Sequence, residues 1–194
     1  MLDFIQPILD GGWVMFPLFL LGLAIYGLGF RMILTLLPMR ARKGSEQTGL
    51  RWVQNPANAP KQIGEIVRYA RAGEGSAAVR ARFEEIRLTE IPRINIDIRV
   101  LGILVNAAPL LGLLGTVLGM LTTFDGLAAG GSEKTATLVA EGIRVALITT
   151  EMGLFLAIPG TFLVYVVKQL RNSFLHLLVR LENASLRAPE QSVS

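Results

Sequence analysis

The chain has 194 residues, no cysteine, 52% hydrophobic residues and a net charge of +4, with a mean hydropathy of +0.50. This composition disfavours a soluble globular domain and predicts a membrane protein, while the lack of cysteine excludes disulfides, thiolate nucleophiles and thiolate metal sites. The basic residues cluster in segments next to the apolar stretches, so we interpret them as a topology signal rather than a nucleic-acid surface.

Three apolar stretches are each long enough to cross a bilayer, which takes about 20 residues of helix. They are Gly11–Phe30, Val100–Phe124 and Thr135–Val167. The first stretch has no basic segment before it and no small-residue cleavage site after it. We therefore predict that it is a retained anchor rather than a signal peptide.

Basic residues outnumber acidic ones between Leu36 and Arg99 and again after Val167. Cytoplasmic loops are enriched in basic residues, so both segments are predicted to be cytoplasmic, with the N-terminus out and the C-terminus in. We predict an all-α integral membrane protein with three transmembrane helices, whose long helices extend into a cytoplasmic helical region. The predicted segments are the N-terminal region and first transmembrane helix (1–37), a cytoplasmic helical loop (38–97), the second transmembrane helix (98–126), a short periplasmic loop (127–137), the third transmembrane helix (138–167) and a cytoplasmic C-terminal helix and tail (168–194).

Local signals refine these segments in chain order. The first helix is predicted to run from about Trp13 to just before Pro38. Ser76 can cap an amphipathic helix that leads into the second span, and Pro92 and Pro109 are predicted to bend or locally open it. After the third span, an apolar stripe typical of a helix that packs on a partner is formed by Leu170, Phe174, Leu177 and Leu181.

The second and third spans each carry a stripe of small residues at helical spacing. On the second span the stripe is Gly112, Thr116, Gly119 and Thr123, and on the third it is Ala146, Thr150, Gly153, Ala157 and Gly160. Small side chains let two helices pack closely, but the same stripes are compatible with a polar passage. Spacing alone leaves both interpretations open.

The third span also carries three charged residues. A charge inside a bilayer is costly, so such residues usually face protein or water and mark a pathway. Glu141 and Arg144 are three residues apart and are interpreted as an ion pair near the outer boundary. Glu151 lies near mid-depth, and it either titrates, contacts a neighbouring subunit or lines water. The one histidine, His176, falls on the predicted cytoplasmic extension, and no spacing suits a metal, a cofactor or enzymatic chemistry.

Two stretches resemble the paired signatures of the MotA/TolQ/ExbB proton-channel family and look closest to its ExbB branch. They are APLLGLLGTVLGMLTTF (Ala108–Phe124) and GIRVALITTEMGLFLAIPG (Gly142–Gly160). The resemblance is specific from about Arg93 to Val167 and elsewhere covers only the layout.

The resemblance implies a multi-pass protein of the bacterial inner membrane that forms a homopentamer and works in a proton-driven motor. The implied partners are an ExbD- or TolR-like single-span protein, whose aspartate carries the proton, and a TonB-like protein that opens outer-membrane transporters. By motif, the family's functional threonines fall on Thr116 and Thr150. The candidate proton-pathway and pore-lining residues are Thr116, Thr150, Glu151, Gly112, Gly119, Thr123, Ala146, Gly153 and Ala157.

The chain departs from the family pattern beside these residues. Many members have a glutamate where this chain has Val145 and a serine where it has Arg144, so Glu151 either takes over part of that role from a different face or the role is not needed. Two further interpretations stay open: a TolQ-like subunit that serves envelope constriction through TolR and TolA, and a non-conducting membrane scaffold. A flagellar stator is disfavoured because that branch has four spans.

Overall fold

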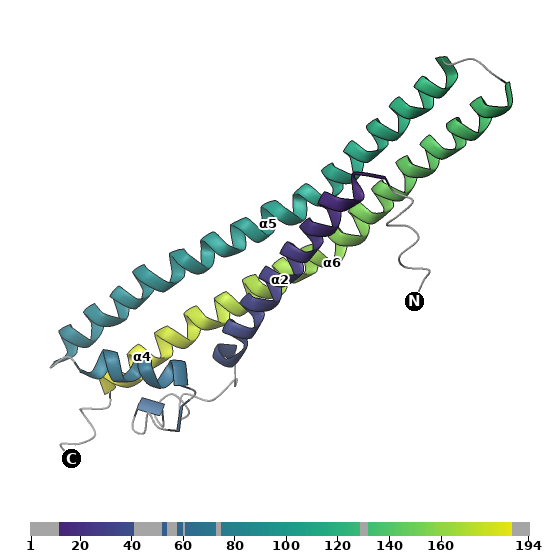
Figure 1. Ribbon diagram of the computed structural model, residues 1–194. Helices are drawn as coiled ribbons and strands as arrows, with labels where there is room; N and C mark the ends of the chain where they lie inside the picture. Colours follow the sequence, from purple (N-terminus) through teal and green to yellow (C-terminus); the bar gives the residue numbers. More distant parts are fainter. Residues whose placement is uncertain are drawn as a thin grey trace. The chain divides into compact units, whose positions relative to one another are not determined.

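The computed structural model describes residues 12–40, 52–53, 58–59, 61–72, 75–128 and 132–187. Their regular structure is helical, and the helices with described bounds are α2 (Met15–Arg40), α4 (Lys61–Arg71), α5 (Ser76–Ala128) and α6 (Ser132–Arg187) (Figure 1). By length and composition, helices α2, α5 and α6 could each cross a membrane, in agreement with the three predicted apolar stretches. Parts of the predicted N-terminal region, both loops and the C-terminal tail lie outside the described residues.

The chain divides into two compact units. Unit 1 comprises residues up to Phe30 together with Val100–Tyr165, and unit 2 comprises Arg31–Arg99 and the residues from Val166 on. The divisions fall where the uncharged stretches of α2 and α5 meet their first charged residues, Arg31 and Arg99. Unit 1 therefore holds the apolar part of each long helix, and unit 2 holds the amphipathic part.

Prolines do not end the long helices. Helix α2 continues through Pro38 to Arg40, three residues beyond the predicted end, and α5 runs without a break through Pro92 and Pro109. A proline removes one backbone donor and crowds the preceding turn, but the turns on either side keep their own hydrogen bonds. At Pro109, inside the apolar stretch from Val100 to Phe124, no water is available to replace them, which favours an unbroken helix.

Unit 2 has an apolar core formed by α4, the first turns of α5 and the last turns of α6. Its fully buried side chains include Ile63 and Val67 of α4, Phe83 of α5, and Leu178 and Leu181 of α6. The predicted α6 stripe thus packs on helices of its own chain: three of its four residues are buried and the fourth is partly buried.

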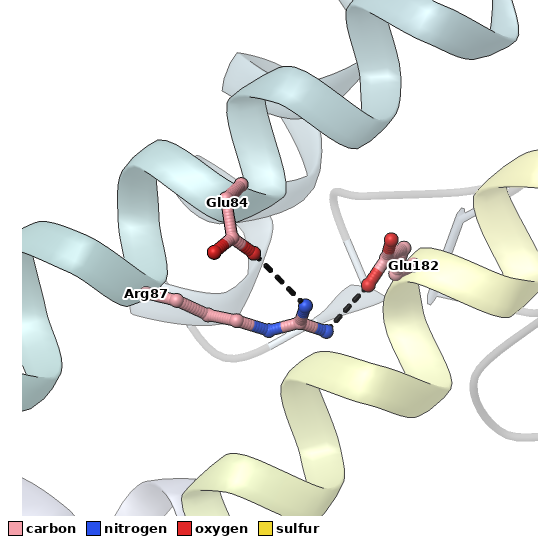
Figure 2. A network of polar contacts seen from close by, with 3 residues as sticks. All are labelled: Glu84, Arg87 and Glu182. Atoms are coloured by element: carbon pink, nitrogen blue, oxygen red, sulfur yellow. Dashed lines mark hydrogen bonds and ion pairs between the residues drawn. The ribbon is translucent and has the colours of Figure 1, made fainter.

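Polar contacts join the helices of unit 2 around this core. Arg87 of α5 bonds both Glu84 on its own helix and Glu182 on α6 (Figure 2). Further along the same pair of helices, the Arg171 guanidinium donates to Asn95 Oδ1 at 2.9 Å. These contacts fix the register between α5 and α6 within unit 2.

Candidate functional site

Helices α5 and α6 approach closely in unit 1. A Cβ added at Gly112 would lie 2.9 Å from the Thr149 carbonyl oxygen, and one added at Gly153 would lie 2.8 Å from the Ala108 carbonyl oxygen. Only glycine allows such backbone contact, which is how small residues bring membrane helices together. We call this contact the α5–α6 seam; its buried small residues are Ala108, Gly112, Gly115, Gly119 and Thr123 of α5 and Gly142, Ala146, Thr149, Gly153 and Ala157 of α6.

The seam departs from the predicted stripes at the threonines, where it buries the preceding residue on each helix. It also includes Ala108 and Gly142, while Gly160, the last residue of the predicted α6 stripe, is buried beside Val105 of α5 and Ile25 of α2. On α5, Gly115 is buried and Thr116 is only half-buried; on α6, Thr149 is fully buried and Thr150 is only half-buried. A Cβ at Gly115 would overlap the side chain of Thr149, so the bare backbone at Gly115 makes room for that threonine. Thr116 and Thr150 therefore lie at the edge of the seam, a placement that the spacing of small residues did not reveal.

The two edge threonines make different hydrogen bonds. The Thr150 hydroxyl donates across the seam to the Gly112 carbonyl oxygen at 3.3 Å, whereas the Thr116 hydroxyl donates to the Leu113 carbonyl oxygen on its own helix at 2.7 Å. Thr116 follows Gly112 by about one helical turn, so both threonines border the same stretch of the seam. Each hydroxyl oxygen keeps lone pairs that can accept a further hydrogen bond.

Helix α2 packs on a different side of α6. The Tyr26 hydroxyl donates to the Leu156 carbonyl oxygen at 3.3 Å, and a Cβ added at Gly22 would lie 2.9 Å from the Leu156 side chain. Leu156 follows Thr150 by six residues, which places it about 120° around the helix. The contacts of α2 thus leave the threonine edge of the seam uncovered within unit 1.

The charged residues of the third span lie outside the seam. Glu141, Arg144 and Glu151 are all exposed, and the pairing of Glu141 with Arg144 stays a prediction. Val145, where many family members have glutamate, lies near the start of α2, since a Cβ at Gly12 would be 3.6 Å from its Cγ1. Glu151 is on a different face of α6 from Val145, so it does not reproduce that position.

Most of the other candidate residues are buried in this chain. Gly112, Gly119, Thr123, Ala146, Gly153 and Ala157 belong to the seam. Their burial explains why they are small; whether they also line a pore in an assembly stays a prediction. Among the described residues, no group of three or more His, Asp or Glu side chains could hold a metal ion.

Three apolar helices, two of them in backbone contact along a threonine-edged seam, define a multi-pass helical membrane protein. The model of the MotA/TolQ/ExbB proton channel family matches residues 56–179, which include the whole seam. The chain belongs to this family.

Individual relatives agree with this assignment. The biopolymer transport protein exbB1 of Vibrio cholerae is 30% identical over 166 residues, covering 77% of this chain and 72% of the relative. The putative biopolymer transport protein ExbB homolog of Methanothermobacter thermautotrophicus is 34% identical over 119 residues, 60% of this chain and 40% of the relative. The Tol-Pal system protein TolQ of Haemophilus influenzae is 40% identical over 71 residues, 37% of this chain and 31% of the relative. No solved structure matches the chain.

Proposed function

We propose that this protein is an ExbB-like subunit of a proton-driven motor in the bacterial inner membrane. With an ExbD-like partner, it uses the proton motive force to energise TonB-dependent transport across the outer membrane. The observation that carries the proposal is the pair of hydroxyls, Thr116 and Thr150, at the uncovered edge of the seam in a chain of a proton channel family. The relative of Vibrio cholerae, which is named a biopolymer transport protein, supports the ExbB branch.

The hydrogen bonds of the two threonines suit an exchange with a partner carboxyl. The Gly112 and Leu113 carbonyls lie inside α5, where each also accepts a backbone N–H bond. If a threonine hydroxyl turns toward an aspartate, its former carbonyl acceptor therefore remains bonded. The switch costs little, and the hydroxyl can donate to a carboxylate or accept from a carboxylic acid.

The threonines can pass a proton but cannot store one. The second span has no titratable residue between Val100 and Phe124, so the proton-carrying group comes from the partner's aspartate or from Glu151. In the proposed assembly, five copies surround the partner helices, and α5 and α6 of each copy present the threonine edge to them.

The distribution of charge supports the proposed orientation. The basic residues between Leu36 and Arg99 lie in unit 2, as do those after Val167, and basic segments are retained on the cytoplasmic side. We therefore propose that unit 2 lies in the cytoplasm, with the N-terminus and the α5–α6 connection on the periplasmic side.

The proposal is tested by proton uptake into liposomes that contain this protein and its ExbD-like partner. Thr116→Val and Thr150→Val keep the side-chain shape but remove the hydroxyl. Loss of one hydrogen bond worth about 1.5 kcal/mol in the transfer step lowers the flux about tenfold. The matched controls are Thr122→Val and Thr161→Val, which also lose a hydroxyl that bonds a carbonyl of its own helix, as Thr116 does, but outside the proposed threonine pair. Assembly of the complex is checked by size-exclusion chromatography for every variant.

Proton flux equal to wild type in all four variants would overturn the channel proposal. It would leave a membrane scaffold, in which the seam serves packing alone. The similarity to TolQ of Haemophilus influenzae favours a second candidate, a TolQ-like subunit of the envelope motor. Co-purification distinguishes the two branches, because an ExbB-like subunit retains an ExbD-like partner and a TolQ-like subunit retains TolR.

A further inference from the structure

Glu151 is not part of the threonine pair, and placing an ionisable side chain at its depth in the span costs free energy. The side chain is exposed and makes no hydrogen bond or ion pair with any residue that the structure describes. It lies near the middle of the apolar stretch from Thr135 to Val167. Ionisable residues at such depths usually belong to ion pathways, because lipid cannot solvate them.

The face of α6 around Glu151 is apolar and uncovered in unit 1. The neighbours one turn away, Leu147, Leu154 and Phe155, are all exposed. Helix α6 uses other sides for its contacts, with Thr149 buried in the seam and Leu156 against α2. The carboxyl therefore faces away from the other helices of its own unit.

Few charged groups in unit 1 can act on this carboxyl. Helix α2 has no charged residue from Met15 to Phe30, and α5 has only Asp125 from Val100 to its end. On α6, Arg144 lies seven residues before Glu151 and Glu141 lies three residues further, so the nearer of the two is about 10 Å away along the axis. Among the described residues of unit 1, none forms a salt bridge with Glu151.

We propose that Glu151 is a proton-exchanging carboxyl that this chain itself contributes, on the outward face of α6 rather than at the threonine edge. The inference rests on the proposed function, which supplies the proton gradient. In the exchange, a carboxylate oxygen takes a proton from hydronium and the resulting O–H returns it to water; no other bond changes. The chain then carries its own titratable group beside the partner's aspartate.

The test is chemical labelling of the full complex in membranes with dicyclohexylcarbodiimide. This apolar reagent takes the proton of a carboxylic acid on its nitrogen, bonds the carboxylate oxygen to its central carbon, and rearranges to a stable N-acylurea. Peptide mass spectrometry should find the adduct on Glu151, formed more slowly as pH rises. Little adduct is expected on Glu141 or Asp125, which lie toward the ends of the apolar segments. A Glu151 that stays unlabelled at every pH overturns the inference.

Proton flux gives the second readout. Glu151→Gln keeps the size but cannot exchange a proton, and we expect flux to fall about tenfold or more; Glu151→Asp should restore both flux and labelling. Glu141→Gln, on the same helix, is the matched control and should keep wild-type flux. Wild-type flux in Glu151→Gln would contradict a role in transport. Normal flux in Thr150→Val would instead contradict the proposed function, while labelling would still report on Glu151.

Discussion

The Thr150 hydroxyl donates a hydrogen bond to the carbonyl oxygen of Gly112, 3.3 Å away on the neighbouring helix. The preceding residue, Thr149, bonds instead to the Val145 and Ala146 carbonyl oxygens of its own helix, each at 3.0 Å, and it is fully buried. Two consecutive threonines thus have different surroundings: one fills the seam and the other bridges it at the edge.

This difference predicts that substitutions at the two adjacent threonines affect proton flux differently. Thr149→Val keeps the branched shape in the seam, and both carbonyl acceptors keep their helical N–H bonds, so stability should change by less than about 1 kcal/mol. Proton flux with the ExbD-like partner should stay near wild type in Thr149→Val and fall in Thr150→Val. The reverse result, with flux lost only in Thr149→Val, would show that the functional hydroxyl had been assigned to the wrong threonine.

The stability change on replacing a glycine by alanine should depend strongly on whether that glycine lies in the seam. In Gly153→Ala the new methyl would lie 2.8 Å from the Ala108 carbonyl oxygen and 3.1 Å from Gly112 Cα. Because backbone must move to admit it, we expect a loss of about 1–3 kcal/mol in stability, seen as a lower thermal unfolding midpoint in detergent.

The matched control is Gly102→Ala, inside α5, where an added Cβ meets nothing within 4 Å. Alanine is favoured over glycine in a helix by about 0.5–1 kcal/mol, so this variant should be as stable as wild type or more stable. Equal losses in both variants would mean that the close approach of α5 and α6 is not what requires glycine at Gly153.

Much of the architecture was predictable because the bilayer constrains sequence strongly. Uninterrupted apolar stretches identified the three candidate spans, and helical apolar spacing identified the stripe of α6. The ends of helices were less predictable: the sequence predicts that α2 ends just before Pro38, yet the helix runs on to Arg40. A proline weakens one turn, but the energy that decides whether a helix continues comes from its neighbours.

The site was predictable in composition but not in side-chain placement. The small-residue steps selected Thr116 and Thr150 together with glycines of the seam, whereas the residues buried there are Gly115 and Thr149. Adjacent residues on a helix differ by about 100°, and a stripe of three- and four-residue steps accepts either neighbour. Only the contact of the Thr149 side chain with the bare backbone of Gly115 distinguishes them.

The ion network of unit 2 predicts unequal contributions from two acids that share one arginine (Figure 2). The side chains of Arg87 and Glu182 are 26% and 17% exposed, whereas that of Glu84 is 57% exposed and lies 3.3 Å from Arg87 on the same helix. Glu182→Gln should destabilise the protein by about 1–2 kcal/mol, because it weakens a charge-assisted bond between α5 and α6. Glu84→Gln should change stability by less than about 0.5 kcal/mol.

These values are measured by chemical unfolding of the purified protein, followed by circular dichroism. A double-mutant cycle with Arg87→Gln isolates the pairwise energies. Coupling of Arg87 to Glu84 as large as its coupling to Glu182 would contradict the assignment of the inter-helix bond as the stronger one.

The last prediction concerns the contact between α4 and α5, where Tyr69 donates a hydrogen bond to Glu85 Oε2 at 2.7 Å. This bond is the main cause that raises the pKa of Tyr69; desolvation and the charge of Glu85 add to it, and nearby Arg82 acts in the opposite direction. A raised pKa in the folded state means that the contact contributes fully below the ordinary tyrosine pKa of about 10. The contribution is lost as pH rises through the higher folded value.

Glu85→Ala removes the acceptor, so the pKa of Tyr69 should fall toward its ordinary value. Glu84→Ala, which removes the neighbouring acid but not the acceptor of Tyr69, should leave it near wild type. Isotope-edited NMR of the tyrosine rings, with Tyr69→Phe to assign the signal, measures the pKa in each variant. The protection factors of the α4 amides, which correct for the faster intrinsic exchange at high pH, should fall at alkaline pH in wild type but not in Tyr69→Phe, because ionised Tyr69 repels Glu85. An identical Tyr69 titration in wild type and Glu85→Ala would show that this hydrogen bond does not hold α4 against α5.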